Sequence, residues 1–475
     1  MDDHLQELHV LAGSLAEKMH VFRRAIERNP SFSRAGARAS VLAVLDVLER
    51  EVISVFAENA DVADSASRLR SLQGMVGAIC ASLDWQSPSF LHALQSEAGL
   101  QTGRIQGTIN DYKRDHHLDS ADYEKRFIRE YVDRKTPLPV RAHLTVSGMS
   151  ALATIVNSLQ MYGVLPGPIL LGCSSYFENK MIIHRLFPGQ VVEVDEEDTE
   201  GLIEAVRLHK PKVIFLDSLC NAQTLAMPDL ARLMPALAKL VTEDTYLVLD
   251  NSGLGPSCQP LRFMPAVPTR FRLVVFESLN KHHQFGLDRV TGGVIWTQEI
   301  YFGWLSGACI HLGTQMPDVS VLSLPTPNRA LLDARLALIG RNAQALAEAL
   351  DTHVRSRPRS PFARVAYPGL PAHPSYAWAR ERSFHGASLI PIFKDDRQAV
   401  RLSKIFLSRA IKEARSAHID LTAGTSFGLD TTRVYLTALH ASKVTTPFLR
   451  ISAGTESPQQ LAVLIEVFKR AMDAL

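Results

Sequence analysis

Lys281 follows an apolar, β-branched run at 273–276 and precedes a Gly-Gly return to a second apolar pair at 294–295. This pattern predicts a buried strand whose exit loop carries the lysine. A loop lysine is usually a solvated cation. With the Ser278 hydroxyl and the Asn280 amide beside it to hold a phosphate, the Lys281 amine could instead form a Schiff base with an aldehyde cofactor. Two upstream stretches bear on this choice.

Asp250 ends an apolar run that starts at Tyr246, upstream of the lysine. A carboxylate at a strand end can simply cap the following turn. Paired with Lys281 it gains a chemical role, because pyridoxal 5'-phosphate withdraws electrons only while its ring nitrogen is protonated. A buried carboxylate stabilises that positive charge.

The third stretch passes from an apolar run through Ser147, Gly148 and Met149 into a helical pattern. Small residues at such a turn leave backbone N–H groups exposed at a helix N-terminus, where a phosphate binds without a local cation. Ser-Gly is common in strand-to-helix turns and alone indicates little. The order of phosphate turn, Asp250 and Lys281 predicts a site for pyridoxal 5'-phosphate.

These motifs resemble those of the Cys/Met-metabolism family of fold-type I pyridoxal-phosphate enzymes. That family includes cystathionine gamma-synthases, cystathionine and methionine gamma-lyases and beta-lyases. The resemblance runs from about Tyr112 to the C-terminus. It implies an α/β fold with a mostly parallel, seven-stranded-type sheet and a smaller C-terminal domain. It also implies that Gly148 and Met149 bind the phosphate, and that Ser278 and Lys281 occupy the family's Ser-x-Thr-Lys motif.

Tyr112 and Arg114 match the family's Tyr-x-Arg motif. In the family this motif reaches across a dimer to the neighbouring subunit's cofactor phosphate, and we expect Tyr112 to contact the substrate as well. The resemblance therefore implies a homodimer or homotetramer with active sites shared between subunits.

The resemblance assigns four further residues. Tyr176 would stack on the cofactor ring and assist the leaving group, and Asn221 would touch the ring hydroxyl. Ser426 and Arg450 fall where the family grips the substrate carboxylate. The planar fork of an arginine suits a carboxylate, although a structural ion pair is the alternative interpretation of Arg450.

Some departures from the family pattern concern the substrate more than the cofactor. Asn280 replaces the usual threonine, the prolines around Asn221 are missing, and Thr431 stands near where many gamma-lyases carry a glutamate. We expect elimination or replacement at Cγ or Cβ of an amino acid, on cystathionine or on a more specialised substrate. An aminotransferase and a non-catalytic homologue used for binding are the alternatives.

The composition is that of a globular protein with an ample core. At 475 residues the chain is long enough for two or three domains, and 46% of it is apolar against 21% charged. The net charge of +2 implies no polyanion partner such as nucleic acid. The acidic N-terminus is unlike a signal peptide, and no apolar run is long enough for a membrane helix. The five scattered cysteines favour a reduced, cytoplasmic setting.

Adjacent histidines at 116–117 and 282–283 raise the question of a metal site. Neighbouring side chains point apart on a strand or helix, and no cysteine or carboxylate cluster accompanies the first pair at ligand spacing. We therefore expect no metal. The second pair is expected to pack beside the cofactor phosphate. Cys220 is expected to be chemically inert, because no activating partner is visible.

The positioning elements divide into three units. Helical periodicity predicts an N-terminal helical module at 1–105, including a short segment near 91–100. Alternating strands and helices predict a pyridoxal-phosphate domain at 106–330, in which ligands bind at the carboxyl ends of parallel strands. A linker helix and an α+β domain occupy 331–475. The family core lacks the helical module, which we expect to widen the dimer or cover the active site, or alternatively to dock a partner.

Overall fold

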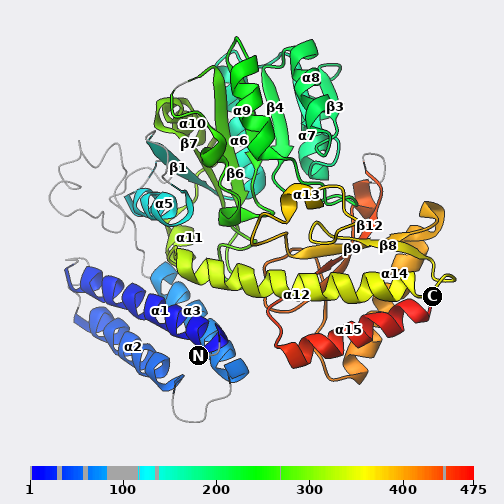
Figure 1. The fold of residues 1–475 in the computed structure, drawn as a ribbon. Coiled ribbons are helices and arrows are strands. Elements are labelled where there is room, and N and C mark those ends of the chain that lie inside the picture. Colours follow the sequence, from blue (N-terminus) through cyan, green and yellow to red (C-terminus); the bar gives the residue numbers. More distant parts are fainter. Residues whose placement is uncertain are drawn as a thin grey trace.

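The computed structural model describes most of the chain (Figure 1). The described residues are 3–28, 35–56, 62–82, 116, 118–133, 139–267, 269–441 and 445–475. The expected helix near 91–100, the Tyr112 and Arg114 motif and His117 lie outside them. None of the helices in these ranges is both long and apolar enough to cross a bilayer.

A seven-stranded sheet forms the centre of the large domain, in the order β1-β7-β6-β5-β4-β2-β3. Neighbouring strands from β3 to β6 pair in parallel, whereas β7 is antiparallel to both β6 and β1. The fold predicted from the sequence, a mostly parallel sheet, is therefore confirmed. The strands are β1 (Val140–Thr145), β2 (Ile169–Gly172), β3 (Val191–Val194), β4 (Val213–Asp217), β5 (Thr245–Asp250), β6 (Phe271–Ser278) and β7 (Gly293–Gln298).

Helices cover both faces of this sheet, which explains why its strands are apolar without alternation. Val248 of β5 packs in one cluster with α6 (Gly148–Met161) and α10 (Glu299–Leu312). Its neighbours Leu247 and Leu249 pack in the opposite cluster, which includes α8 (Thr199–His209) and α9 (Leu230–Leu240). Successive side chains of a strand point to opposite faces, so each face receives its own core.

The C-terminal domain packs its helices on a five-stranded sheet of order β10-β11-β12-β9-β8. The long helix α12 (Arg329–Arg355) links it to the large domain (Figure 1). Its strands are β8 (Phe362–Ala366), β9 (Ser388–Phe393), β10 (Thr422–Ala423), β11 (Arg433–Thr437) and β12 (Phe448–Ser452). Its main helices are α14 (Asp396–Ser416) and α15 (Pro458–Asp473), the latter begun by a capping box of Ser457 and Gln460.

The N-terminal helices α1 (Asp3–Arg28), α2 (Ala35–Ser54) and α3 (Val62–Ser82) share a core of their own. Along α1, apolar side chains three or four residues apart are buried, among them Met19 and Ile26. The module packs against the rest of the protein where α3 meets α11 (Asp318–Ser323) and α1 meets α12. It therefore lies at the base of the helix that joins the two domains (Figure 1).

Candidate active site

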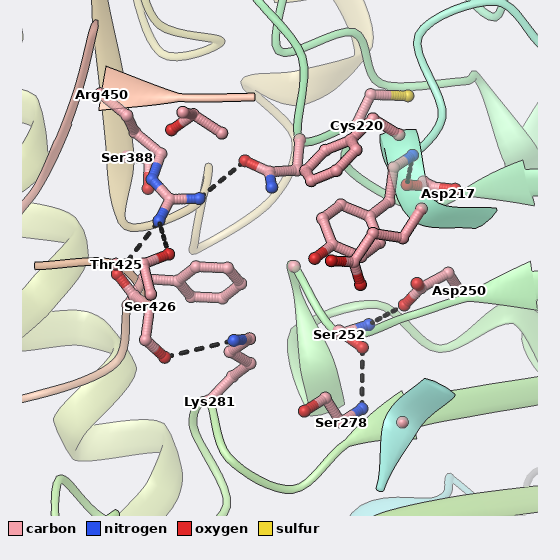
Figure 2. Close-up of a pocket in the computed structure, with 18 of the residues that line it drawn as sticks. Asp217, Cys220, Asp250, Ser252, Ser278, Lys281, Ser388, Thr425, Ser426 and Arg450 are labelled. Atoms are coloured by element: carbon pink, nitrogen blue, oxygen red, sulfur yellow. Dashed lines mark hydrogen bonds between the residues drawn. The ribbon is translucent and has the colours of Figure 1, made fainter. Parts of the chain in front are cut away.

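The strand ends of the large domain open into a cavity of about 770 Å³ that the C-terminal domain closes from the other side. In the parallel register, Asp217 at the end of β4 pairs with Asp250 at the end of β5, which in turn pairs with Phe276 of β6. The loop after β6 then brings Lys281 into the same cavity (Figure 2). The strand exits at Asp250 and Lys281, which were singled out from the sequence, thus meet the exit at Asp217 along one edge of the sheet.

The Lys281 amine points into this cavity. Its Nζ donates a hydrogen bond to Ser426 Oγ at 3.2 Å and lies 5.2 Å from the centre of the Phe427 ring. Burial, reinforced by the positive charge of Arg450, lowers the pKa of Lys281 to about 8. No carboxylate of the described residues forms an ion pair with it. A lysine with a pKa this close to neutrality can lose its proton and act as a nucleophile or base.

Asp250 lies across the cavity from the lysine (Figure 2). Its carboxylate accepts hydrogen bonds from the Ser252 backbone N–H at 2.9 Å and from Asn179 Nδ2 at 3.3 Å. Burial nevertheless raises the pKa of Asp250 above its ordinary value, and no ion pair among the described residues includes it. A protonated ring nitrogen would supply the missing positive charge.

Asp217 lies next to Asp250 at the strand ends and holds the start of the following helix in place. Its Oδ2 accepts a hydrogen bond from the Tyr176 backbone N–H at 2.9 Å, which fixes the start of α7 (Phe177–Leu186). Burial, followed by the nearby Asp250 charge, holds the pKa of Asp217 well above its ordinary value. Tyr176 itself lines the cavity, and burial raises the pKa of its hydroxyl, so the phenol keeps its proton.

The turn into α6 is shaped to receive a phosphate. Ser147 caps the helix, its Oγ accepting from the Ser150 N–H at 3.0 Å. A Cβ on Gly148 would lie 2.9 Å from the Ser278 Cβ, so only a glycine lets the two segments approach this closely. Gly148, Met149 and Ser278 all line the cavity. This cradle, the lysine and the uncompensated Asp250 carboxyl together fit pyridoxal 5'-phosphate.

Arg450 enters from β12 of the C-terminal domain and is only 3% exposed. Its Nη1 donates to Asn221 Oδ1 at 2.8 Å, and its Nη2 reaches Thr425 Oγ1 and the Ser426 carbonyl, each at 3.4 Å. Burial lowers its pKa to about 10. In the described part of the chain no carboxylate pairs with it, so the structural ion pair considered above has no counterpart there. A buried guanidinium of this kind is suited to a carboxylate from a substrate.

Other candidates from the sequence occupy different positions. Asn280 borders the cavity, but its amide bonds to its own loop, donating to the Val290 carbonyl at 3.0 Å and accepting from the Gly292 N–H at 3.0 Å. His282 and His283 do not line the cavity. They support the lysine loop from behind through the Gly253 carbonyl and Glu277, which corrects their expected place beside the phosphate.

Cys220 lines the cavity as a neutral thiol. Its Sγ lies 3.5 Å from Glu196 Oε1, and burial holds its pKa well above the ordinary value. Asn179 and Ser252, which hold the Asp250 carboxylate by hydrogen bonds, were not predicted from the sequence. The sequence could have indicated Asn179, because it lies three residues after Tyr176 and therefore on the same face of the helix.

An ion-pair network ties the helical module to the active-site loop. Arg335 of α12, 1% exposed, pairs with Glu7 of α1 at 2.9 Å and with Asp430 at 2.7 Å. It also donates to the Gly428 carbonyl at 3.1 Å, and Arg70 of α3 pairs with the same Asp430. The loop so held carries Ser426, the hydrogen-bond partner of Lys281. The module therefore supports the cavity wall from outside.

We expect Asp430→Asn to lower the free energy of unfolding by about 3 kcal/mol, because it leaves the buried Arg335 without one of its compensating charges. Although burial opposes ionisation, Arg335 and Arg70 hold the pKa of Asp430 below its ordinary value. Urea unfolding measures the loss. As a matched control, Glu51→Gln breaks the exposed pair with Arg68 and should cost less than about 1 kcal/mol. Equal losses in the two variants would contradict the buried network.

Fold and cavity together define a fold-type I enzyme architecture with a pyridoxal-phosphate site. A family model described as "Cys/Met metabolism PLP-dependent enzyme" matches residues 106–472, and the chain belongs to that family. The match leaves out the three N-terminal helices.

Similar structures include a cystathionine gamma synthase from Xanthomonas oryzae pv. oryzae, solved in complex with cystathionine. It has a TM-score of 0.60 and 20% identity, over 78% of this chain and 89% of that one. CalE6, a methionine gamma lyase from Micromonospora echinospora, has a TM-score of 0.59 and 21% identity, over 76% and 88%. At these identities the likeness concerns the fold.

A sequence relative is the "Bifunctional enzyme flvA" of Aspergillus flavus, 24% identical over 328 residues. The aligned segment covers 66% of this chain but only 37% of that relative's length.

Proposed function

We propose that the protein catalyses elimination or replacement at Cγ or Cβ of an amino acid, as a carbon–sulfur or carbon–heteroatom lyase or a gamma-synthase. The observation that carries the proposal is the geometry of one cavity. There, a lysine with a lowered pKa and an arginine that pairs with no carboxylate among the described residues lie opposite a buried carboxyl at the strand ends. Membership of the Cys/Met family supports the same reaction class.

The residues that would hold the cofactor all belong to the large domain. The α6 turn at Gly148 and Met149, with Ser278, would bind the phosphate, and Asp250 would pair with the ring nitrogen. Tyr176 would cover the ring. When bound, pyridoxal 5'-phosphate supplies an electron sink for negative charge that develops at the substrate Cα.

The side chains around this group would perform the proton transfers. Arg450 would orient the amino acid by its carboxylate, with Asn221 holding the guanidinium in place. Lys281 Nζ, released by the incoming amino group, would take the Cα proton, and Ser426 Oγ would fix its direction. Because the Tyr176 phenol is kept protonated by burial, it can donate a proton to the departing heteroatom.

The experiment that tests this function is a screen of purified enzyme against amino acids with a heteroatom at Cβ or Cγ. Release of ammonia and a 2-oxo acid, or capture of an added nucleophile, would support elimination or replacement. Stoichiometric conversion of the cofactor to its amine form would instead identify an aminotransferase. A purified protein without the cofactor's visible absorbance, even after addition of pyridoxal 5'-phosphate, would refute the proposal.

We further propose a homo-oligomer in which Tyr112 and Arg114 serve the neighbouring subunit. Arg114→Ala and Lys281→Ala should each be inactive or nearly so alone. A mixed dimer restores one complete site, since the intact lysine of one subunit meets the intact arginine of the other. We therefore expect activity to recover after the two variants are unfolded and refolded together. No recovery, with wild-type protein refolding normally, would mean that Arg114 acts within its own subunit.

A further inference from the structure

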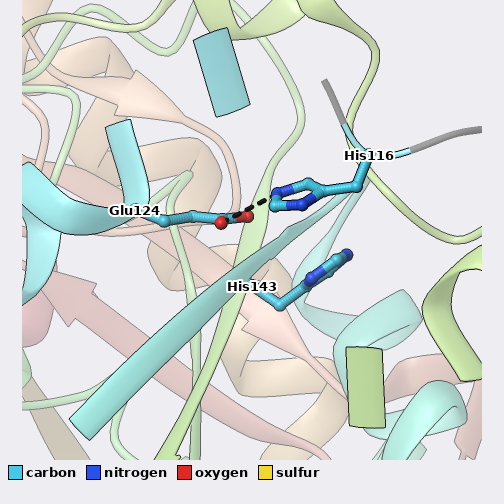
Figure 3. A group of neighbouring side chains, drawn as sticks. All are labelled: His116, Glu124 and His143. Atoms are coloured by element: carbon cyan, nitrogen blue, oxygen red, sulfur yellow. Dashed lines mark hydrogen bonds and ion pairs between the residues drawn. The ribbon is translucent and has the colours of Figure 1, made fainter. Parts of the chain in front are cut away.

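Away from the cavity, His116, Glu124 and His143 form a cluster (Figure 3). His116 precedes α5 (Leu118–Tyr131), Glu124 lies on that helix, and His143 is in the middle of β1. All three side chains are buried, and one ligand atom from each lies within 4.8 Å of the other two. None of them lines the active-site cavity. The cluster is thus a second polar centre inside the large domain.

His143 is the residue that hydrogen bonding leaves unexplained. It is 0% exposed, and neither ring nitrogen has a hydrogen-bond partner within the described structure. Its ring centre lies 4.7 Å from that of His116. Buried polar atoms normally form hydrogen bonds, so an imidazole in which neither nitrogen has a partner points to a ligand that binds the ring.

Glu124 is oriented as a metal-binding carboxylate would be. Its Oε1 accepts a hydrogen bond from the Leu144 backbone N–H at 2.8 Å, which fixes the carboxylate to β1. Its Oε2 lies 2.9 Å from His116 Nε2, on the side of the two imidazoles. One oxygen is therefore held by the backbone while the other faces the centre of the cluster, the arrangement expected of an oriented metal ligand.

We propose that His116, Glu124 and His143 bind a divalent transition-metal ion of the zinc type. Two imidazoles and one carboxylate suit zinc and its neighbours better than the harder magnesium or calcium. In a tetrahedral zinc site neighbouring ligand atoms are about 3.3 Å apart, so the side chains need to close by only a small movement. The fourth position is left to a water molecule.

The place of the cluster gives the ion a structural role. It would fasten the segment at residue 116 and helix α5 to β1. Leu144 is followed by Thr145, the last residue of β1, whose Oγ1 donates to the carbonyl of Ser147 in the phosphate turn at 2.9 Å. The sequence pattern around the histidine pair at 116–117 shows no cysteine or carboxylate cluster at ligand spacing. It could not include Glu124, eight residues from His116, or an imidazole from another element.

The test uses Co²⁺ as a visible probe on the tag-free holoenzyme after treatment with a chelator. We expect one equivalent per chain, ligand-field bands of a tetrahedral site and a higher Tm. Glu124→Gln and His143→Leu should each weaken Co²⁺ binding by at least about tenfold. His184→Leu, which removes an exposed histidine paired with Glu193, is the matched control and should bind normally.

Glu124→Gln keeps the shape of the side chain, so it remains informative if His143→Leu fails to fold. Absence of stoichiometric Co²⁺ binding by the wild type would overturn the proposal, and so would unchanged affinity in a folded Glu124→Gln variant. In either case the cluster would be a hydrated His–Glu pair. The amino-acid screen above is independent of this outcome.

Discussion

Lys281→Ala is expected to abolish turnover and covalent retention of the cofactor. The substitution removes both the amine that attaches the cofactor and the base at Cα, so we expect a loss beyond about 10⁴-fold, the upper range for acid–base catalysis alone. Borohydride reduction followed by peptide mass spectrometry would find the label at position 281 in the wild type and nowhere in the variant. Lys212→Ala, which removes an exposed lysine on the same domain, should be active and labelled normally.

The pH dependence of attachment provides a second readout. Only the neutral amine attacks an aldehyde, and the pKa of Lys281 is lowered to about 8. Attachment of the cofactor to the apoprotein should therefore accelerate as pH rises towards 8 and level off above it. A rate that keeps rising to the pH of an ordinary lysine, or full activity in Lys281→Ala, would contradict the assignment.

Asp250→Asn is expected to lower kcat by about 10²–10³-fold, in the range for loss of one preorganised electrostatic contact. The amide keeps the size of the side chain but cannot stabilise a protonated ring nitrogen. Steady-state kinetics at saturating cofactor measure the loss. Asp217→Asn is the matched comparison. The Asp217 carboxylate accepts a hydrogen bond from the Tyr176 backbone N–H and is not placed to meet the ring nitrogen in our proposal, so its effect should be smaller. An unchanged kcat in Asp250→Asn would mean that another group faces the ring nitrogen.

The same substitution should stabilise the apoprotein. Burial raises the pKa of Asp250 in the folded state, so the folded chain holds its proton more tightly than the unfolded chain. Stability from that group is present at low pH and is lost as pH rises from the unfolded pKa to the folded one. At neutral pH the ionised carboxylate therefore opposes folding, and an amide does not. We expect a higher Tm for Asp250→Asn apoprotein, together with its lower activity, as is common where function requires an unfavourable group.

The parts of the site that lie close in sequence to a strand end could be predicted. Asp250, Lys281 and the turn at Gly148 are marked by apolar strands, and the parallel register brings them together. In the small domain, strands β9 and β12 are mostly apolar and can be recognised from the sequence, whereas β11 reads Arg-Val-Tyr-Leu-Thr and cannot. Its Tyr435 is exposed, so burial on one face only weakens the apolar signal.

Long-range partners could not be predicted in this way. Arg335 meets Glu7 across 328 positions and the Gly428 carbonyl across 93. The helical pattern places Arg335 on the apolar face of α12, three residues after Leu332 and four before Ile339, but it does not say which groups the arginine meets. The same holds for His143, which the pattern of β1 presents as one more interior position. Such contacts depend on how elements pack, which periodicity does not specify.

The shared ion pairs at Asp430 have a consequence for the ancestry of the chain. The family-matched segment at 106–472 includes Arg335 and Asp430 but neither Glu7 nor Arg70. Removing the helical module would leave the buried Arg335 without its ion pair to Glu7. It would also remove the ion pair between Arg70 and Asp430, which holds the loop that carries Ser426. The extension and the enzyme body are therefore no longer exchangeable parts. A chain without residues 1–105 is expected to need compensating substitutions at positions 335 and 430 to keep its stability.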